Sequence, residues 1–186
     1  MPRKIKFDVD QHKYFLGDRE IPGVTTIMKG LNLIDDRWFT EESRETGTAV
    51  HEILELYDKG IKVEPKHALI GYLSAYQAFL SENSSLYVKE IEKTVYEPNM
   101  SYCGKLDRIM INCDTGQKFL IDIKTGAPLR NHKLQCSAYA LAARDKSLLI
   151  GGLYLTADGK YKFKLYPRMD SVWRSVMKVY DFKERR

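Results

Sequence analysis

The spacing of apolar residues predicts that the chain begins with short strands. Over residues 4–27 apolar and polar side chains alternate, which is the pattern of a strand with one buried face. The alternation is interrupted at Asp10-Gln11 and at Gly17-Asp18, and Pro22-Gly23 marks a further turn. A hairpin or a small group of short strands is therefore expected at this end of the chain.

Two helices are expected next. Residues 36–57 are rich in helix-forming side chains, and Gly47 indicates a break or a close contact midway. Residues 66–80 carry apolar side chains at helical spacing. The apolar stripes consist of Val50, Ile53, Leu54 and Tyr57 in the first segment and of Leu69, Leu73, Tyr76 and Leu80 in the second.

The rest of the chain mixes strands and helices. Strand patterns cover residues 87–96, 102–112, 118–124, 147–156 and 160–166, and helical patterns cover residues 131–144 and 171–182. A turn at residues 113–116 joins the second and third strands in a hairpin, and Asp158-Gly159 is a strong hairpin turn between the last two. Helices on either side of a central hairpin predict an α/β or α+β sandwich.

Composition and charge narrow the class of protein. The chain has 186 residues, 44% hydrophobic and 30% charged, so a single globular domain over residues 1–186 is expected. A net charge of +5 and a pI near 9.0 suit a polyanionic partner such as nucleic acid. Three cysteines, none in a C-x-x-C pair, argue against a disulfide framework or an all-cysteine metal centre.

The sequence also predicts where the protein works. No apolar run approaches the roughly 20 residues that span a bilayer, so no membrane partner is expected. The basic start of the chain lacks the apolar stretch of a secretory signal. We expect a cytoplasmic protein of a bacterium or a phage-infected host, and an organellar relative also fits.

The strand at residues 118–124 places two charged side chains in an apolar setting. Asp122 and Lys124 share one face of it. If the hairpin loop is centred between Asp114 and Thr115, Asp107 lies directly opposite Asp122. The Cβ atoms of directly opposed residues lie about 5 Å apart, and two carboxylates that close repel each other unless one is protonated or a cation bridges them. This register, which requires a loop with an even number of residues, predicts a bridging divalent metal.

Asp107, Asp122 and Lys124 together suit metal-assisted cleavage of a phosphodiester. Mg²⁺ and Mn²⁺ prefer oxygen ligands, and the backbone carbonyl of Ile123 could complete their shell. A bound metal lowers the pKa of its water and neutralises charge on the phosphate. Lys124 can orient the attacking water or stabilise the developing negative charge. The alternative is a surface ion pair, because a lone Asp-x-Lys is common.

Several segments resemble one family. Residues 104–107 (Gly-Lys-Leu-Asp) and 120–126 (Leu-Ile-Asp-Ile-Lys-Thr-Gly) resemble the core of the PD-(D/E)xK nuclease superfamily and, more narrowly, its RecB-like exonuclease branch. Residues 47–51 (Gly-Thr-Ala-Val-His) resemble the helical histidine motif of that branch, and Gln135-x-x-x-Tyr139 resembles its Gln/Tyr helix. His12-x-Tyr14 and residues 22–25 (Pro-Gly-Val-Thr) resemble the N-terminus of phage and mitochondrial single-strand exonucleases.

Two differences from the family are visible. Asp122 stands where many superfamily members carry Glu, although RecB-like members commonly use Asp. Relatives that hold an iron–sulfur cluster on four cysteines are disfavoured, because this chain has three. The resemblance spans roughly residues 5–142 and rests on the order and spacing of motifs that are weak individually.

The resemblance implies a restriction-endonuclease-like core, in which a central mixed β-sheet is flanked by helices. It implies catalytic roles for Asp107, Asp122 and Lys124 and metal coordination by His51, Asp107, Asp122 and Ile123. An imidazole ligand would favour Mn²⁺ more than an all-oxygen site does. Gln135 and Tyr139 would lie beside the active site and position nucleic acid. The implied activity is a DNA exonuclease acting on single strands or strand ends, with a recombination or replication protein as the expected kind of partner.

Some interpretations stay open at this level. His51 could be a structural histidine, and Tyr139 could pack in the core. One of the carboxylates that precede the hairpin could be a further ligand, and these are Glu90, Glu92 and Glu97. The alternating lysines of the last hairpin form either a solvated face or a phosphate-tracking stripe, and these are Lys160, Lys162 and Lys164. The rival functions are a structure-specific endonuclease on the same fold and a nucleic-acid-binding protein that does not cleave.

Overall fold

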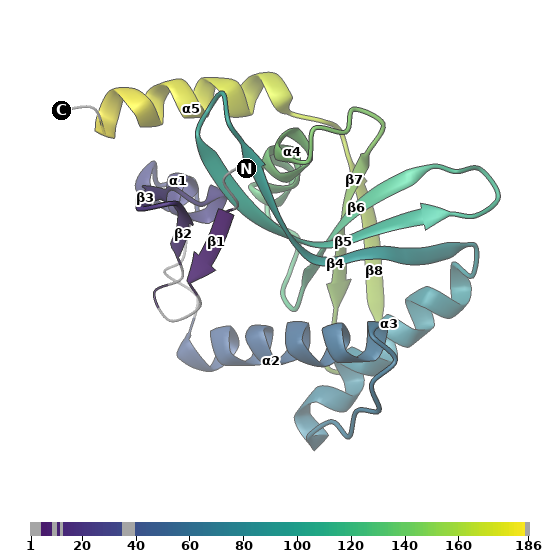
Figure 1. The fold of residues 1–186 in the computed structure, drawn as a ribbon. Coiled ribbons are helices and arrows are strands. Elements are labelled where there is room, and N and C mark those ends of the chain that lie inside the picture. Colours follow the sequence, from purple (N-terminus) through teal and green to yellow (C-terminus); the bar gives the residue numbers. More distant parts are fainter. Residues whose placement is uncertain (1–4, 9–10, 12, 35–39, 185–186) are drawn as a thin grey trace.

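The computed structural model describes residues 5–8, 11, 13–34 and 40–184. Within them, five strands form the central sheet in the order β4-β5-β6-β7-β8 (Figure 1). The strands are β4 (Leu86–Glu97), β5 (Tyr102–Asn112), β6 (Lys118–Lys124), β7 (Leu149–Leu155) and β8 (Tyr161–Tyr166). All neighbours are antiparallel except β6 and β7, which are joined through a helix and run parallel. The predicted mixed α/β sheet flanked by helices is confirmed.

Helices cover both faces of this sheet. One face packs against α1 (Val24–Gly30), α4 (His132–Ala142) and α5 (Asp170–Glu184), and its core includes Leu120 and the fully buried Trp173. The other face packs against α2 (Glu41–Asp58) and α3 (Ile70–Glu82), which a short 3₁₀ turn (His67–Leu69) precedes. Ile121 and Ile123 point into this second core, so β6 alternates between the two faces as its sequence predicts.

A second, small sheet lies beside α1. It consists of β1 (Ile5–Asp8), β2 (Lys13–Leu16) and β3 (Arg19–Ile21), in that order (Figure 1). The expected strand character beyond the Pro22-Gly23 turn is wrong, because residues 24–27 open α1. The helix buries Val24, Ile27 and Met28, which recur at helical spacing. The predicted features at Asp10 and His12, and the expected start of the helix at residue 36, lie outside the described residues.

Gly47 does not interrupt α2, which is continuous from its N-cap at Thr40. A Cβ on Gly47 would lie 3.7 Å from Oγ1 of Thr125, the residue that follows β6. The expected break is not observed, and a Cβ at this distance would make an ordinary van der Waals contact, so the structure does not require a glycine here. The approach brings the middle of α2 to the end of β6, where Lys124 lies.

The central hairpin has the register that the sequence predicts, although its backbone pairing ends at Arg108 and Ile121, before the expected pair of Asp107 and Asp122. Its backbone pairs include Arg108 with Ile121 and Ile111 with Lys118, so the loop is centred between Asp114 and Thr115. The side chain of Asn112 accepts hydrogen bonds from the backbone N–H groups of Asp114 and Thr115, which closes the turn. None of the helices in the described part of the chain is long and apolar enough to cross a membrane.

Candidate active site

Asp107 lies where the two strands of the hairpin separate. Backbone pairing of β5 and β6 ends at Arg108 and Ile121. Beyond that point the carboxylate of Asp107, which is buried, accepts a hydrogen bond from the Ile123 N–H at 2.6 Å. The side chain therefore replaces the backbone acceptor that a continuing strand would supply. The N–H and C=O of a strand residue point to the same neighbour, so the Ile123 carbonyl also faces this gap.

His51 and Glu92 lie close to the carboxylate of Asp107. Nδ1 of His51, from α2, is 3.7 Å from Oδ1 of Asp107 and 3.6 Å from Oε1 of Glu92, from β4. One ligand atom from each of the three residues lies within 4.8 Å of the others. Although burial would lower the pKa of His51, Asp107 and Glu92 raise it. An imidazole nitrogen and two carboxylates at this spacing form a donor set for a divalent cation.

Of the three carboxylates left open by the sequence, Glu92 is the one at the site. A β-bulge between Val88 and Glu90 changes the register of β4, and Glu92 itself has a positive φ of 47°. Its carboxylate contacts Lys105 at 2.9 Å and Arg108 at 2.9 Å. Burial raises the pKa of Glu92, but His51 and Lys105 outweigh it and lower the pKa to about 2, so the group is ionised.

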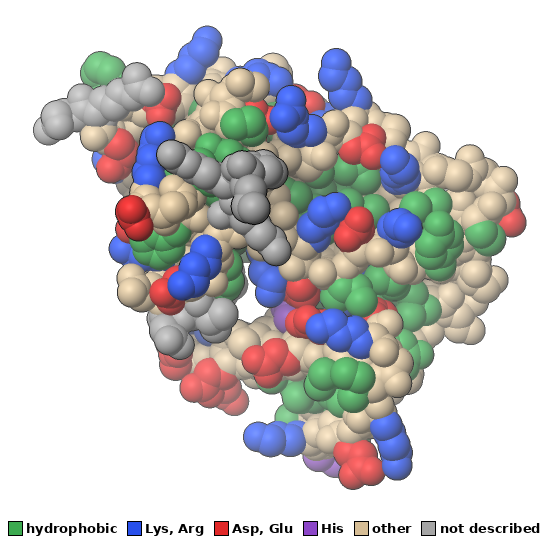
Figure 2. All heavy atoms as spheres, in the orientation of Figure 1, with side chains coloured by type: hydrophobic (Ala, Val, Ile, Leu, Met, Phe, Trp, Pro, Cys, Tyr) green, Lys and Arg blue, Asp and Glu red, His purple; other side chains and the backbone are tan. Residues whose placement is uncertain are grey.

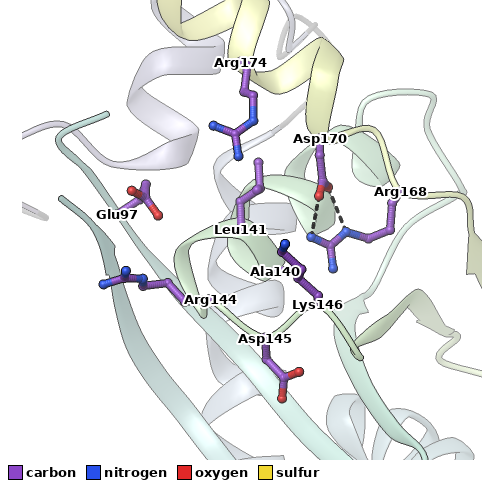
Figure 3. Close-up of a pocket in the computed structure, with 9 residues that line it drawn as sticks. All are labelled: Glu97, Ala140, Leu141, Arg144, Asp145, Lys146, Arg168, Asp170 and Arg174. Atoms are coloured by element: carbon purple, nitrogen blue, oxygen red, sulfur yellow. Dashed lines mark hydrogen bonds and ion pairs between the residues drawn. The ribbon is translucent and has the colours of Figure 1, made fainter. Parts of the chain in front are cut away.

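Glu90 and Glu97 lie elsewhere. Glu90 pairs with Lys93 at the surface, at 3.1 Å. Glu97 lines a separate hollow of about 480 Å³ at the C-terminal end of α4, where Figure 3 shows it with Arg144 and Arg174. Apart from Glu97, the described lining of this hollow contains no residue that the sequence proposed for the site. The sequence alone could not separate these glutamates, because a bulge and a positive φ decide which face each one reaches.

Asp122, which is buried, and Lys124, which is partly exposed, form an ion pair next to this cluster. Nζ of Lys124 is 2.7 Å from Oδ2 of Asp122, which makes no hydrogen bond with the described residues. Burial raises the pKa of Asp122, Lys124 lowers it and Asp107 raises it, with a result of about 6. Burial would lower the pKa of Lys124, but Asp122 and Asp107 raise it above its ordinary value. Asp122 lies outside the tight group of His51, Glu92 and Asp107.

The raised pKa of Asp122 predicts a pH-dependent stability of the metal-free protein. Such a carboxyl contributes stability that is present below pH 4 and is lost as the pH rises through about 6. Asp122→Asn cannot ionise, so its free energy of unfolding relative to the wild type should increase by about 1–3 kcal/mol between pH 4 and pH 7.5. Urea unfolding in EDTA measures this, and a difference that does not change with pH would contradict it.

Gln135 and Tyr139 lie together on α4, as their spacing predicts. Nε2 of Gln135 donates to the Tyr139 hydroxyl at 2.9 Å. The Tyr139 ring is 6% exposed and lies against Gly104, where a Cβ would come within 2.6 Å of it. Burial raises the pKa of Tyr139, and the charges of Asp122 and Lys124 act on it. Tyr139 is thus a core residue that also lies near the Asp122–Lys124 pair, and its role in positioning nucleic acid stays a prediction.

A groove of about 850 Å³ adjoins the ion pair. Lys124 and Gln135 line it, with residues from α1, α2 and the loop between β6 and α4. Its described lining contains four cations and no carboxylate, and the cations are Lys29, Arg44, Lys124 and Arg130. Figure 2 shows the surface hollowed between the small sheet and α2, with a histidine and charged side chains at the edge. A groove with charges of one sign attracts a polyanion.

Comparisons with known proteins place this architecture. No family model and no curated protein matches the chain. LHK-Exo in complex with dAMP aligns over 88% of this chain and 87% of its own, with 13% identity and a TM-score of 0.51. This protein has a restriction-endonuclease-like fold. The alkaline exonuclease LHK-Exo from Laribacter hongkongensis also aligns in a second structure, over 73% of this chain and 78% of its own (14% identity, TM-score 0.46). A "putative exonuclease" from Eubacterium rectale aligns over 88% of this chain and 72% of its own, with 12% identity and a TM-score of 0.47.

In this restriction-endonuclease-like fold, a buried arginine forms an ion-pair network that the sequence did not indicate. Arg108 is fully buried, and its Nε lies 2.5 Å from Oδ2 of Asp58 at the end of α2. Its Nη1 binds Glu92 and also donates to the Asp107 carbonyl at 2.8 Å. Asp58 and Arg108 are 50 positions apart, and neither belongs to a motif, so no signal in the sequence joins them.

Proposed function

We propose that the protein is a metal-dependent DNA nuclease, and specifically an exonuclease that acts on single strands or strand ends. The proposal rests on a metal-ligand cluster, an ion pair and a groove that lie next to one another at the end of β6. A cluster of metal-ligating groups around Asp107 adjoins the Asp122–Lys124 pair, and Lys124 also lines a cationic groove. Metal-assisted hydrolysis of a phosphodiester needs these parts side by side.

The residues present fit a divalent cation. His51, Asp107, Asp122 and the Ile123 carbonyl would hold Mg²⁺ or Mn²⁺, and Glu92 is added to the set that the sequence proposed. The fit rests on the chemistry of the donor set, because one ligand atom each of His51, Glu92 and Asp107 lies within 4.8 Å of the others. When bound, the metal would activate a water and offset the charge of the scissile phosphate.

The protein's own groups supply positioning and charge. Lys124 keeps its proton next to two carboxylates, so it presents a fixed positive charge where negative charge develops on the phosphate. Asp107 is held in place by the Ile123 N–H, which fixes one of its oxygens and leaves the other toward His51. Gln135 borders both the groove and Tyr139, which suits a role in placing the strand.

The exonuclease part of the proposal draws support from the structural neighbour. LHK-Exo is named as an alkaline exonuclease and was solved with dAMP, a deoxynucleoside monophosphate. A recombination or replication protein as partner follows from the family resemblance and is proposed on that basis alone.

Circular DNA tests the exonuclease assignment. We expect linear single-stranded DNA to be degraded to nucleotides with Mg²⁺ or Mn²⁺, while closed single-stranded circles of the same sequence stay intact, because a circle has no end. Gel electrophoresis of both substrates over the same time course measures this. Rapid conversion of circles to linear strands would instead favour the structure-specific endonuclease, and cleavage of neither would favour a binding protein.

Glu92 should contribute to metal binding, unlike its neighbour Glu90. We expect Glu92→Gln to weaken Mn²⁺ binding by about 10–100-fold, because it removes a charged donor beside His51 and Asp107. Glu90→Gln is the matched control, since Glu90 is on the same strand and pairs only with Lys93 among the described residues. Titration of each protein with Mn²⁺ by calorimetry measures the difference. Equal affinities would remove Glu92 from the ligand set.

A further inference from the structure

His132, the first residue of α4, is held by two hydrogen bonds at a single ring nitrogen. The Leu129 N–H donates to its Nδ1 at 3.3 Å, and the Tyr154 hydroxyl lies 2.8 Å from the same atom. A backbone N–H can only donate, so Nδ1 is an acceptor and carries no proton. The proton of the neutral ring is therefore on Nε2, at the opposite side of the imidazole.

Two tyrosine hydroxyls extend the hydrogen bonding at Nδ1 of His132. The Tyr154 hydroxyl is also hydrogen-bonded to the Tyr166 hydroxyl from β8. Because Tyr154 donates to His132, it accepts from Tyr166, and the chain runs in one direction. Gly152 leaves room for the two hydroxyl groups, since a Cβ there would lie 2.5 Å from the Tyr166 hydroxyl oxygen and 3.0 Å from that of Tyr154.

The His132 ring borders the groove. His132 is among the residues that line the groove, with Lys124 and Gln135. Tyr154, which is hydrogen-bonded to Nδ1 of the ring, is the neighbour of Lys124 across the β6–β7 pair. In the part of the chain that the structure describes, Nε2 makes no hydrogen bond. Burial and then the charge of Lys124 lower the pKa of His132 to about 4, so the ring is neutral at physiological pH.

We propose that His132 is a positioning residue whose Nε2–H donates to a non-bridging phosphate oxygen of the DNA strand in the groove. This inference rests on the proposed function, because it requires a strand there. The phosphate is favoured as the acceptor because the described lining is cationic and lacks carboxylates, which draws the backbone of the strand inward. The two hydrogen bonds to Nδ1 fix the orientation of the ring at the start of α4. The neutral Nε2–H can therefore form a directional hydrogen bond to a phosphate that the cations attract.

The tautomer can be measured without any cleavage. In metal-free protein labelled with ¹⁵N, the His132 ring should show a protonated Nε2 and a bare Nδ1 from pH 5.5 to 8. A short single-stranded oligonucleotide added in EDTA should shift the Nε2 signal. A proton on Nδ1, titration near the ordinary histidine pKa, or no shift with bound oligonucleotide would overturn the proposal, whether or not the protein proves to be a nuclease.

Kinetics of two substitutions test the role in positioning. With linear single-stranded DNA, His132→Phe should raise KM about tenfold and change kcat much less, because it loses one hydrogen bond to a charged group. His132→Gln should recover most of the loss, since its amide can place an N–H where Nε2–H was. If His132→Phe leaves KM unchanged, or if His132→Gln folds normally and is equally impaired, the residue has no such role. Loss of cleavage in the wild type would instead count against the proposed function and leave the ¹⁵N result to decide this inference.

Discussion

Asp122→Ala should abolish Mg²⁺-dependent cleavage while the protein still binds DNA. The substitution removes a buried carboxylate that pairs with Lys124 and that we propose as a metal ligand. We expect cleavage to fall by at least about 10²–10³-fold, the usual cost of losing one preorganised charged group at such a site. Binding should persist because the cations that line the groove remain. Digestion of labelled single-stranded DNA and a filter-binding assay measure the two properties.

A matched control comes from the same hairpin. Asp114 lies exposed in the loop between β5 and β6, so Asp114→Ala changes the same residue type without touching the site. It should cleave as the wild type does. Full activity of the Asp122→Ala variant, at unchanged stability, would remove the assignment of this site and with it the proposed chemistry.

Arg108→Met should destabilise the protein by about 3–5 kcal/mol. The arginine is fully buried and pairs with Asp58 and Glu92, so its loss leaves the buried carboxylate of Asp58 without its cation and removes one of the cations beside Glu92. Burial raises the pKa of Asp58 and Arg108 lowers it, so loss of the arginine should raise this pKa further. Urea unfolding followed by circular dichroism measures the change in free energy of unfolding at pH 7.5.

Two further variants serve as controls for Arg108→Met. Arg44→Met removes a surface arginine that lies 3.5 Å from Glu41, and it should cost less than about 1 kcal/mol. Adding Asp58→Asn to Arg108→Met should recover part of the loss, because one buried charge is then removed as well. A cost for Arg108→Met as small as that of the surface variant would mean that the buried network does not hold β5 against α2.

The hairpin shows how far the sequence alone reaches. Its register followed from the alternation on β6 and the length of the loop, both of which are local, and Arg108 indeed pairs with Ile121. Local signals also located the elements from β4 to α5 to within a few residues. They failed at the turn after Pro22, where helical spacing was mistaken for strand alternation. The roles assigned to His51, Asp107, Asp122 and Lys124 remain predictions that the substitutions above test.

The sequence determined the hairpin with its register and the helix that carries Gln135 and Tyr139, because short-range periodicity fixes which side chains share a face. Only the tertiary structure decided that Glu92 joins His51 and Asp107, since a β-bulge and a positive φ turn that side chain toward α2. It likewise decided the partner of Nδ1 of His132. Such contacts depend on how distant elements pack, and packing leaves no periodic signal in the chain.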